Sequence, residues 1–308
     1  MTKSRIKPPA LRPGDLIGIA APASNIKPSM LEEGCRELQS LGFRTVYGPG
    51  ITTAYRYFSG TDERRAAELL EMIRNPDVRA IFCARGGYGS VRLLPYLEPE
   101  LILANPKIIN GSSDITSLLT FLDRSNLVGF HGPMVATAIR QGTASYDQKL
   151  LMDLLRGEIV RFPLAGTSVL RSGTAEGRLT GGCLSLVVAT LGTAYEIDTA
   201  DSILVLEDVD TRPYQIDRML TQLKHAGKLE GVQGIVFGEM LNCAQHVNQG
   251  YSLEEVVMDV LGDTAFPVLY GFSTGHTSGP NVIVPFGVRA RLSLGSSSVF
   301  ELMEPAVS

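Results

Sequence analysis

The 308-residue chain contains no tryptophan, only four histidines and only four cysteines. The cysteines are too far apart for a Cys-x-x-Cys redox motif or a zinc-binding spacing, and they lie at Cys35, Cys83, Cys183 and Cys243. No set of histidines or cysteines has the spacing of metal ligands, so we expect neither a metal nor another cofactor. The chain has no basic run and a formal net charge of −4, which argues against nucleic acid and anionic membranes as partners.

Long apolar segments are also missing. No apolar run approaches the roughly 20 residues that a membrane-spanning helix needs. The basic segment 1–10 lacks the apolar centre of a secretory signal, so we expect a cytoplasmic protein. Hydrophobic residues make up 44% and charged residues 19%, which predicts a folded chain with a sizeable core. The length suggests two domains of roughly 150 residues each.

The first half alternates short apolar runs with segments of helical periodicity. This alternation predicts βαβ units and a mostly parallel sheet, whose ligands bind beyond the carboxyl ends of the strands. The predicted strands are 15–22, 43–47, 78–84, 108–109 and 127–133. The predicted helices are 28–41, 61–75, a short one ending at 97, one ending near 123, 134–140 and 146–155.

The pattern changes after a break near 157–166. Beyond the break, short strands predominate, at 169–170, 175–179, 202–209, 232–240, 268–272, 282–285, 289–294 and 299–303. Helices are expected at 181–191, 213–225 and 253–261. We therefore predict an α/β domain over 1–157, a linker over 158–166 and a smaller β-rich domain over 167–308.

Serines occupy a predicted strand-to-helix junction. Ser112, Ser113 and Asp114 follow the strand at 108–109 and the turn Asn110-Gly111. A serine at such a junction is surrounded by the first N–H groups of the helix, which is the layout of a nucleophile elbow. Ser113 is also a good helix N-cap, and most serines at such junctions are only caps.

The loop Arg85-Gly86-Gly87-Tyr88-Gly89-Ser90 follows another buried strand. It lacks the Gly-x-Gly-x-x-Gly spacing and the Gly-Lys-Ser/Thr of phosphate-binding loops, so the signal for a nucleotide-dependent enzyme is weak. Its exposed N–H groups could instead form an oxyanion hole. The simplest alternative is a tight turn with Ser90 as the N-cap of the next helix.

An activated serine needs a base within hydrogen-bond reach. His225 is expected at a solvated helix end and His246 in a polar loop. His131 follows a buried strand, where a hydrogen-bonded structural histidine is the simpler interpretation. His276 lies in a glycine-flanked loop between apolar strands, which would present its ring to a cleft; the alternative is a mobile surface histidine.

The base in turn needs a carboxylate to orient it. Glu207 ends an apolar strand, and alternation places it on the same face as Ile203 and Val205, so its side chain should point inward. A buried glutamate needs a partner, which favours a role in orienting a histidine. The alternative is an ion pair with Arg212 or Arg218.

Taken together, these segments resemble the LD-carboxypeptidase family, which includes murein tetrapeptide carboxypeptidases and microcin-resistance peptidases. The resemblance runs along nearly the whole chain. It implies a flavodoxin-like or Rossmann-like N-terminal domain with a parallel sheet, a smaller β-rich C-terminal domain and a homodimer. Its specific points are Gly14-Asp15, Ala21-Pro22, Arg85-Gly86-Gly87-Tyr88-Gly89, Gly111-Ser112-Ser113-Asp114, Phe130-His131-Gly132-Pro133, Gly181-Gly182 with Leu184, Leu206-Glu207-Asp208 and Gly275-His276.

The resemblance also implies roles for single residues. The family's nucleophile is the serine immediately before the aspartate, here Ser113, and its glutamate and histidine match Glu207 and His276. Its oxyanion hole maps to the N–H groups of Gly87 and Asp114, with Gly86 a weaker match for the glycine. The family often has an aromatic residue before the nucleophile, whereas this chain has Ser112.

The reaction that the resemblance implies is the cleavage of an L,D peptide bond. It would release terminal D-alanine from a cytoplasmic muropeptide tetrapeptide during cell-wall recycling. Microcin-type members stack a nucleobase on an aromatic side chain, often tryptophan. The absence of tryptophan therefore favours a muropeptide over a peptide–nucleotide substrate. Two alternatives stay open, a nucleotide-dependent enzyme that uses the 85–90 loop and a non-catalytic binding module on the same fold.

Overall fold

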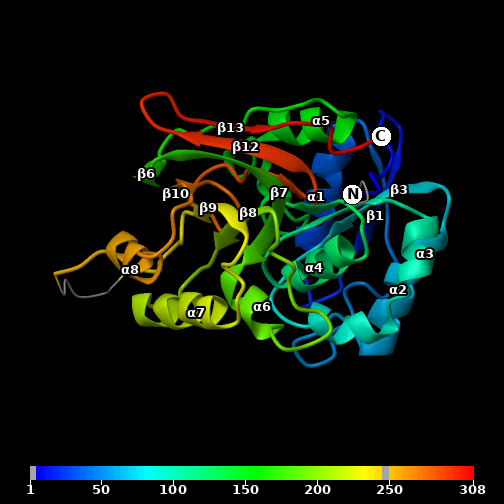
Figure 1. Ribbon diagram of the computed structural model, residues 1–308. Helices are drawn as coiled ribbons and strands as arrows, with labels where there is room; N and C mark the ends of the chain where they lie inside the picture. The colour runs from blue at the N-terminus through cyan, green and yellow to red at the C-terminus, as the bar shows by residue number, and fades with distance from the viewer. Residues whose placement is uncertain (1–4, 245–249) are drawn as a thin grey trace.

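The structure is a computed structural model that describes residues 5–244 and 250–308. Two β-sheets lie next to each other and helices flank them (Figure 1). One hydrophobic core is continuous across both sheets and includes Ile17 and Phe82 of the first sheet and Val205 and Leu292 of the second. Segments near the two termini lie side by side, because Ala10 N–H donates to the Ser308 carbonyl at 3.0 Å.

The first sheet has the strand order β11-β5-β4-β3-β1-β2. Strands β1 to β5 are parallel, and β11 is antiparallel to β5. The order 2-1-3-4-5 of the parallel strands is that of flavodoxin-like folds. The strands are β1 (Leu16–Ala20), β2 (Arg44–Val46), β3 (Val78–Cys83), β4 (Ile108–Gly111), β5 (Gly129–His131) and β11 (Val284–Phe286).

The second sheet has the order β13-β12-β7-β8-β9-β10-β6, with β7 to β10 parallel and the flanking strands antiparallel. Alternate residues of β8 face different layers. Ile203 and Val205 enter the core shared with the first sheet, whereas Leu204 and Leu206 pack with the helices. The strands are β6 (Ser168–Arg171), β7 (Gly173–Cys183), β8 (Ser202–Glu207), β9 (Val232–Gly238), β10 (Val268–Phe272), β12 (Arg289–Leu294) and β13 (Val299–Leu302).

The helices begin and end at recognisable signals. Thr61 accepts a hydrogen bond from Arg64 N–H at the start of α2, and α5 ends at Gly157 with a left-handed φ of 95°. Helices α6, α7 and α8 cover one face of the second sheet (Figure 1). The α-helices are α1 (Pro28–Ser40), α2 (Asp62–Arg74), α3 (Pro99–Ala104), α4 (Thr116–Arg124), α5 (Gln148–Arg156), α6 (Leu184–Ala189), α7 (Pro213–His225) and α8 (Leu253–Val260). The 3₁₀ helices are η1 (Ser90–Tyr96), η2 (Ser113–Ile115) and η3 (Ile139–Ala144).

The predicted fold class is confirmed, because a parallel α/β sheet is followed by a β-rich second half. The helix predicted over 181–191 is shorter, since β7 continues to Cys183 through Gly181 and Gly182, both at positive φ. The helix predicted over 134–140 is replaced by turns and η3, and α3 was not predicted. Strand β11 comes from the predicted second domain but pairs with β5 of the first sheet. The domain boundary over 158–166 stays a prediction.

Within residues 5–244 and 250–308, no helix combines the length and apolarity needed to cross a membrane.

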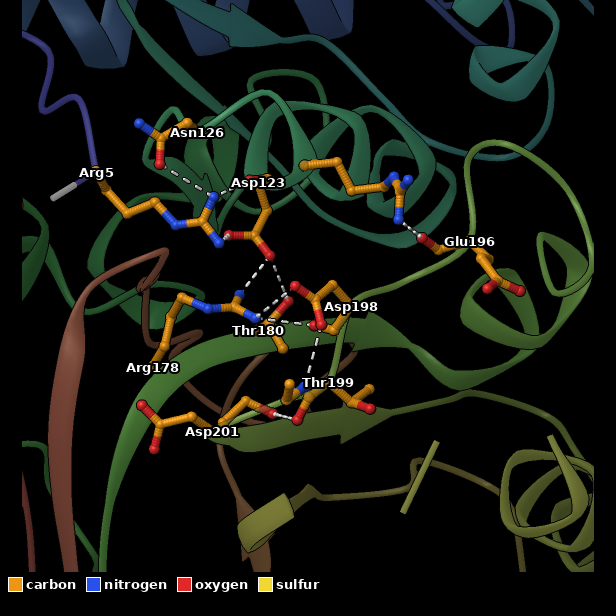
Figure 2. Close-up of polar contacts among 12 residues, drawn as sticks. Arg5, Asp123, Asn126, Arg178, Thr180, Glu196, Asp198, Thr199 and Asp201 are labelled. Carbon is orange, nitrogen blue, oxygen red and sulfur yellow. Dashed lines mark hydrogen bonds and ion pairs between the residues drawn. The ribbon is translucent and has the colours of Figure 1, made fainter. Parts of the chain in front are cut away.

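A buried ion-pair network joins the two halves. Figure 2 shows Asp123, at the end of α4, between Arg5 of the N-terminal segment and Arg178 of β7. The Asp123 side chain is only 2% exposed, and its carboxylate also accepts a hydrogen bond from Thr180 Oγ1 at 3.2 Å. Removing one member of such a buried set leaves uncompensated charge, which costs far more than breaking a solvated pair. The network therefore fixes α4 against β7.

We expect Asp123→Asn to lower the free energy of unfolding by about 3 kcal/mol, because two guanidinium groups lose their anion. The matched control is Glu98→Gln, which breaks the exposed Arg74–Glu98 pair at 3.2 Å. That change should cost less than about 0.5 kcal/mol. Urea unfolding of both variants measures the difference, and equal losses would contradict a stabilising role for the network.

Candidate active site

Ser113 lies in a strained turn between β4 and α4. Its φ is 59°, in the left-handed region that residues other than glycine rarely adopt. The expected alternative, that Ser113 is the N-cap of the following helix, is wrong: Ile115 precedes α4, and no side-chain cap is formed there. Non-glycine residues with such strain cluster at active sites, and a strained strand-to-helix serine is the hallmark of a nucleophile elbow.

The glycine loop after β3 packs directly against this turn. A Cβ added to Gly86 would lie 2.8 Å from Ser113 Cβ and 3.1 Å from Asp114 N, so only glycine fits there. Asp114 ties the loop to the turn, because its Oδ2 accepts from Ser90 N–H at 2.7 Å and its carbonyl from Ser90 Oγ at 2.5 Å. Ser90 therefore links the glycine loop to the Ser113 turn. The N-cap position of η1 is Gly89, so the alternative that Ser90 is the N-cap is wrong.

Glu207, at the end of β8, and His276, in the loop after β10, form a hydrogen-bonded pair. Glu207 ends β8 and is fully buried, as predicted. Its Oε2 accepts from His276 Nδ1 at 2.7 Å and from the His276 backbone N–H at 3.0 Å. The alternative pairing with Arg212 or Arg218 is therefore wrong. Since Nδ1 faces the carboxylate, Nε2 is the ring nitrogen left to act as a base.

The electrostatics of the pair favour charge on both partners. Burial alone would lower the pKa of His276, but the hydrogen bond and charge of Glu207, aided by Asp208 and Asp210, raise that pKa above its usual value. Burial likewise opposes ionisation of Glu207, yet the hydrogen bonds and charge of His276 lower the pKa of this carboxyl. The histidine is thus prepared to accept and hold a proton.

His131 lies behind Glu207. Its Nε2 is 3.8 Å from Glu207 Oε1, and its ring stacks on Phe286 with centroids 5.4 Å apart. Burial lowers the pKa of His131 to about 4, so the ring is neutral at physiological pH. Neither ring nitrogen is hydrogen-bonded to a described residue, which contradicts the predicted hydrogen-bonded role. The side chain is completely buried and does not line the cavity described below.

The loop that carries His276 is braced by residues that the sequence did not single out. Glu239 accepts from Ser273 Oγ at 2.8 Å through Oε1 and from Ser278 N–H at 2.8 Å through Oε2. Asn281 Nδ2 donates to the Gly275 carbonyl at 2.5 Å. Glu239 was detectable in principle, because it follows β9, the parallel neighbour of β8, and so lies at the same sheet edge as Glu207.

A cavity of about 480 Å³ lies where the strand ends of the two sheets meet. Ser113 and His276 both line it, together with Gly87 of the glycine loop. The other lining residues are Arg85, Gly86, Ser112, Met134, Thr137, Ala138, Gln141, Ser145, Leu241, Gly275, Thr277, Ser278, Gly279 and Asn281. His225 is exposed at the end of α7, as expected, and His246 lies outside the described residues. The cavity therefore brings the predicted serine and histidine to one site.

Comparison with known proteins identifies the family of the chain. Residues 17–132 match the LD-carboxypeptidase N-terminal domain and residues 176–292 the LD-carboxypeptidase C-terminal domain. A probable murein peptide carboxypeptidase of Bacillus subtilis is 39% identical over 98% of this chain and 95% of its own length. The murein tetrapeptide carboxypeptidase of Pseudomonas aeruginosa is 32% identical over 90% of this chain and 92% of its own.

Relatives with another named role also match. The microcin C7 self-immunity protein of Escherichia coli is 31% identical over 93% of this chain and 92% of its own. A solved structure of a microcin self-immunity protein with glutamyl sulfamoyl guanosine superposes with a TM-score of 0.87 at 26% identity, covering 98% of this chain and all of that one. The family matches support a serine peptidase. The chain belongs to the LD-carboxypeptidase family.

Two glycines of the His276 loop provide a matched test of the Glu207–His276 geometry. Gly275 has a φ of 76°, and an added Cβ would lie 2.7 Å from Glu207 Oε1 and closer still to the carboxyl carbon. A Cβ on Gly279 would meet no atom within 4 Å. We expect Gly275→Ala to reduce kcat/KM by about 10²-fold, because a misplacement near 1 Å has effects of that size. Gly279→Ala should retain wild-type kcat/KM, and equal effects would refute this geometry.

Proposed function

We propose that the protein is a serine carboxypeptidase with Ser113 as nucleophile, His276 as general base and Glu207 as its orienting carboxylate. The observation that carries this proposal is the 2.7 Å Glu207–His276 hydrogen bond beside a cavity that Ser113 lines in a strained turn. A nucleophile, a base and a carboxylate that orients the base are the parts that serine hydrolysis requires.

The mechanism follows from these positions. His276 Nε2 removes the Ser113 hydroxyl proton as Oγ attacks the scissile carbonyl, and Glu207 stabilises the resulting imidazolium. The N–H groups of Gly87 and Asp114 would stabilise the oxyanion, since the glycine loop packs against the Ser113 turn. His276 then protonates the departing amine, and the C–N bond breaks. A water molecule activated by His276 hydrolyses the acyl-enzyme and restores Ser113.

The proposed substrate is a muropeptide tetrapeptide that ends in D-alanine, cleaved at its L,D bond. Support comes from the relatives named as murein carboxypeptidases, which match over nearly the whole chain. The setting would be cytoplasmic cell-wall recycling, and the family resemblance adds a homodimer. The absence of tryptophan adds to this choice.

A peptide–nucleotide conjugate is the second candidate substrate. The structural relative with glutamyl sulfamoyl guanosine and the 31% identical microcin C7 self-immunity protein favour it. Among the described residues that line the cavity, however, His276 has the only aromatic ring, and no other ring is present on which a nucleobase could stack. The muropeptide therefore remains the better-supported substrate.

A hydrolysis screen tests the function and the nucleophile together. We expect cleavage of a tetrapeptide that ends in D-alanine and no cleavage of its L-alanine epimer or of an aspartyl-nucleotide conjugate. Ser113→Ala should reduce kcat by about 10⁴- to 10⁶-fold and abolish labelling by a fluorophosphonate. Ser112→Ala, the matched control from the same turn, should keep both properties. Labelling that survives in Ser113→Ala would refute the assignment, and cleavage of the conjugate alone would refute the substrate.

The pH dependence tests Glu207 and His276 as a unit. His276 must be neutral to act as a base, so kcat/KM should fall as the pH drops through its pKa, which Glu207 raises above that of an ordinary histidine against the opposing effect of burial. Glu207→Gln removes the charge that raises this pKa, so the acidic limb should move to lower pH while kcat falls by about 10²- to 10⁴-fold.

The double variant Glu207→Gln/His276→Ala should be hardly slower than His276→Ala alone, since the members of a triad are not additive. Multiplicative losses would show that the two residues act independently.

A further inference from the structure

The cavity carries a positive charge whose role the mechanism leaves open. Arg85 lines it beside Gly86 and Gly87, and none of the described lining residues is an aspartate or a glutamate. Glu207 is buried behind His276, and the buried Asp114 carboxylate is bound to Ser90. Among the described residues that line the cavity, an anion would therefore meet one arginine and no carboxylate.

The Arg85 side chain is exposed and largely available for a ligand. Its Nη1 donates to the Asn25 carbonyl at 3.2 Å, which fixes the guanidinium at the cavity wall, and no ion pair of Arg85 with a described carboxylate is present. A guanidinium has five N–H donors in a planar fork that matches a carboxylate. Most of this donor capacity therefore remains for a substrate.

A second arginine already supports the glycine loop. Arg65 is fully buried, and it donates to the carbonyls of Pro22 and Gly89 and pairs with Asp62. This side chain is buried beneath the loop and does not line the cavity. Support of the loop therefore does not account for Arg85.

We infer that Arg85 binds the terminal carboxylate of the peptide and makes the site selective for a free C-terminus. The inference rests on the proposed carboxypeptidase function. When a carboxypeptidase cleaves the last peptide bond, only the nitrogen and Cα of the leaving residue separate the scissile carbonyl from the carboxylate. The carboxylate receptor must therefore lie beside the oxyanion hole. Arg85 belongs to the same loop as Gly87 and lines the same cavity as Gly87 and Ser113, so it is a candidate for this receptor.

The part of the cavity lining that follows β5 is neutral. Thr137, Gln141 and Ser145 contribute hydroxyl and amide groups there, and Met134 contributes an apolar surface. Such groups can bind the uncharged peptide backbone and the small methyl side chain without competing for the carboxylate. Charge-assisted bidentate pairing would then make Arg85 the principal discriminator between an acid and an amide.

The test compares two peptides that differ only at the terminus, one ending in D-alanine and one in D-alaninamide. Wild-type enzyme should cleave the acid with the higher kcat/KM. Arg85→Gln should lower kcat/KM for the acid by about 10- to 100-fold, the effect of losing a hydrogen bond to a charged group, mainly through KM. Cleavage of the amide should stay within about threefold. Arg56→Gln removes a nearby exposed cation that does not line the cavity and should change neither rate.

Fluorophosphonate labelling separates this inference from the proposed function. Labelling of Ser113 at the wild-type rate in Arg85→Gln, with loss of the preference for the acid, supports the inference. Equal losses for acid and amide, or a wild-type enzyme that cleaves both equally well, would overturn it while leaving the serine mechanism intact. A wild-type protein that is neither labelled nor able to cleave either peptide would overturn both.

Discussion

The hydrogen bond between Glu207 and His276 is the interaction on which the site depends. A fully buried carboxylate is unfavourable unless its charge is compensated, and here two donors from one histidine meet one of its oxygens. The close approach of Gly275 to this carboxylate and the brace from Glu239 both hold the loop that delivers those donors. Much of the local structure thus serves to keep a single buried anion in place.

The two sheets place the reacting groups through one geometric rule. The loops after β3 and β4 of the first sheet and after β8 and β10 of the second all follow the carboxyl ends of parallel strands. The cavity lies where these two sets of strand ends meet. The Asp123 network holds the two sets of strand ends in place relative to each other. Helix α4 starts beside the Ser113 turn, and Asp123 near its end pairs with Arg178 of β7, the neighbour of β8.

Local patterns in the sequence predicted most elements, because periodicity and caps act over few residues. The helix over 213–225 and the strands over 268–272 and 289–294 have the predicted bounds. The inward direction of Glu207 followed from alternation alone. What failed depended on distant contacts: Gly181 and Gly182 pair with β8 as part of β7, and only glycine fits there because a Cβ would collide with Val205 or Thr116. The role of Asn281 and the exposure of Arg85 to the cavity become evident only when segments far apart in the sequence meet.

The return of β11 to the first sheet has a consequence for biosynthesis. Strand β5 is complete once residue 131 has been made, but its neighbour comprises Val284–Phe286. On the ribosome, the nascent first sheet therefore keeps an open edge until almost the whole chain has emerged. Open edges invite pairing with other chains, and slow translation would prolong this exposure. The loop that carries His276 immediately precedes β11 in the chain. The candidate active site and the last strand of the first sheet are therefore completed at the same stage of synthesis.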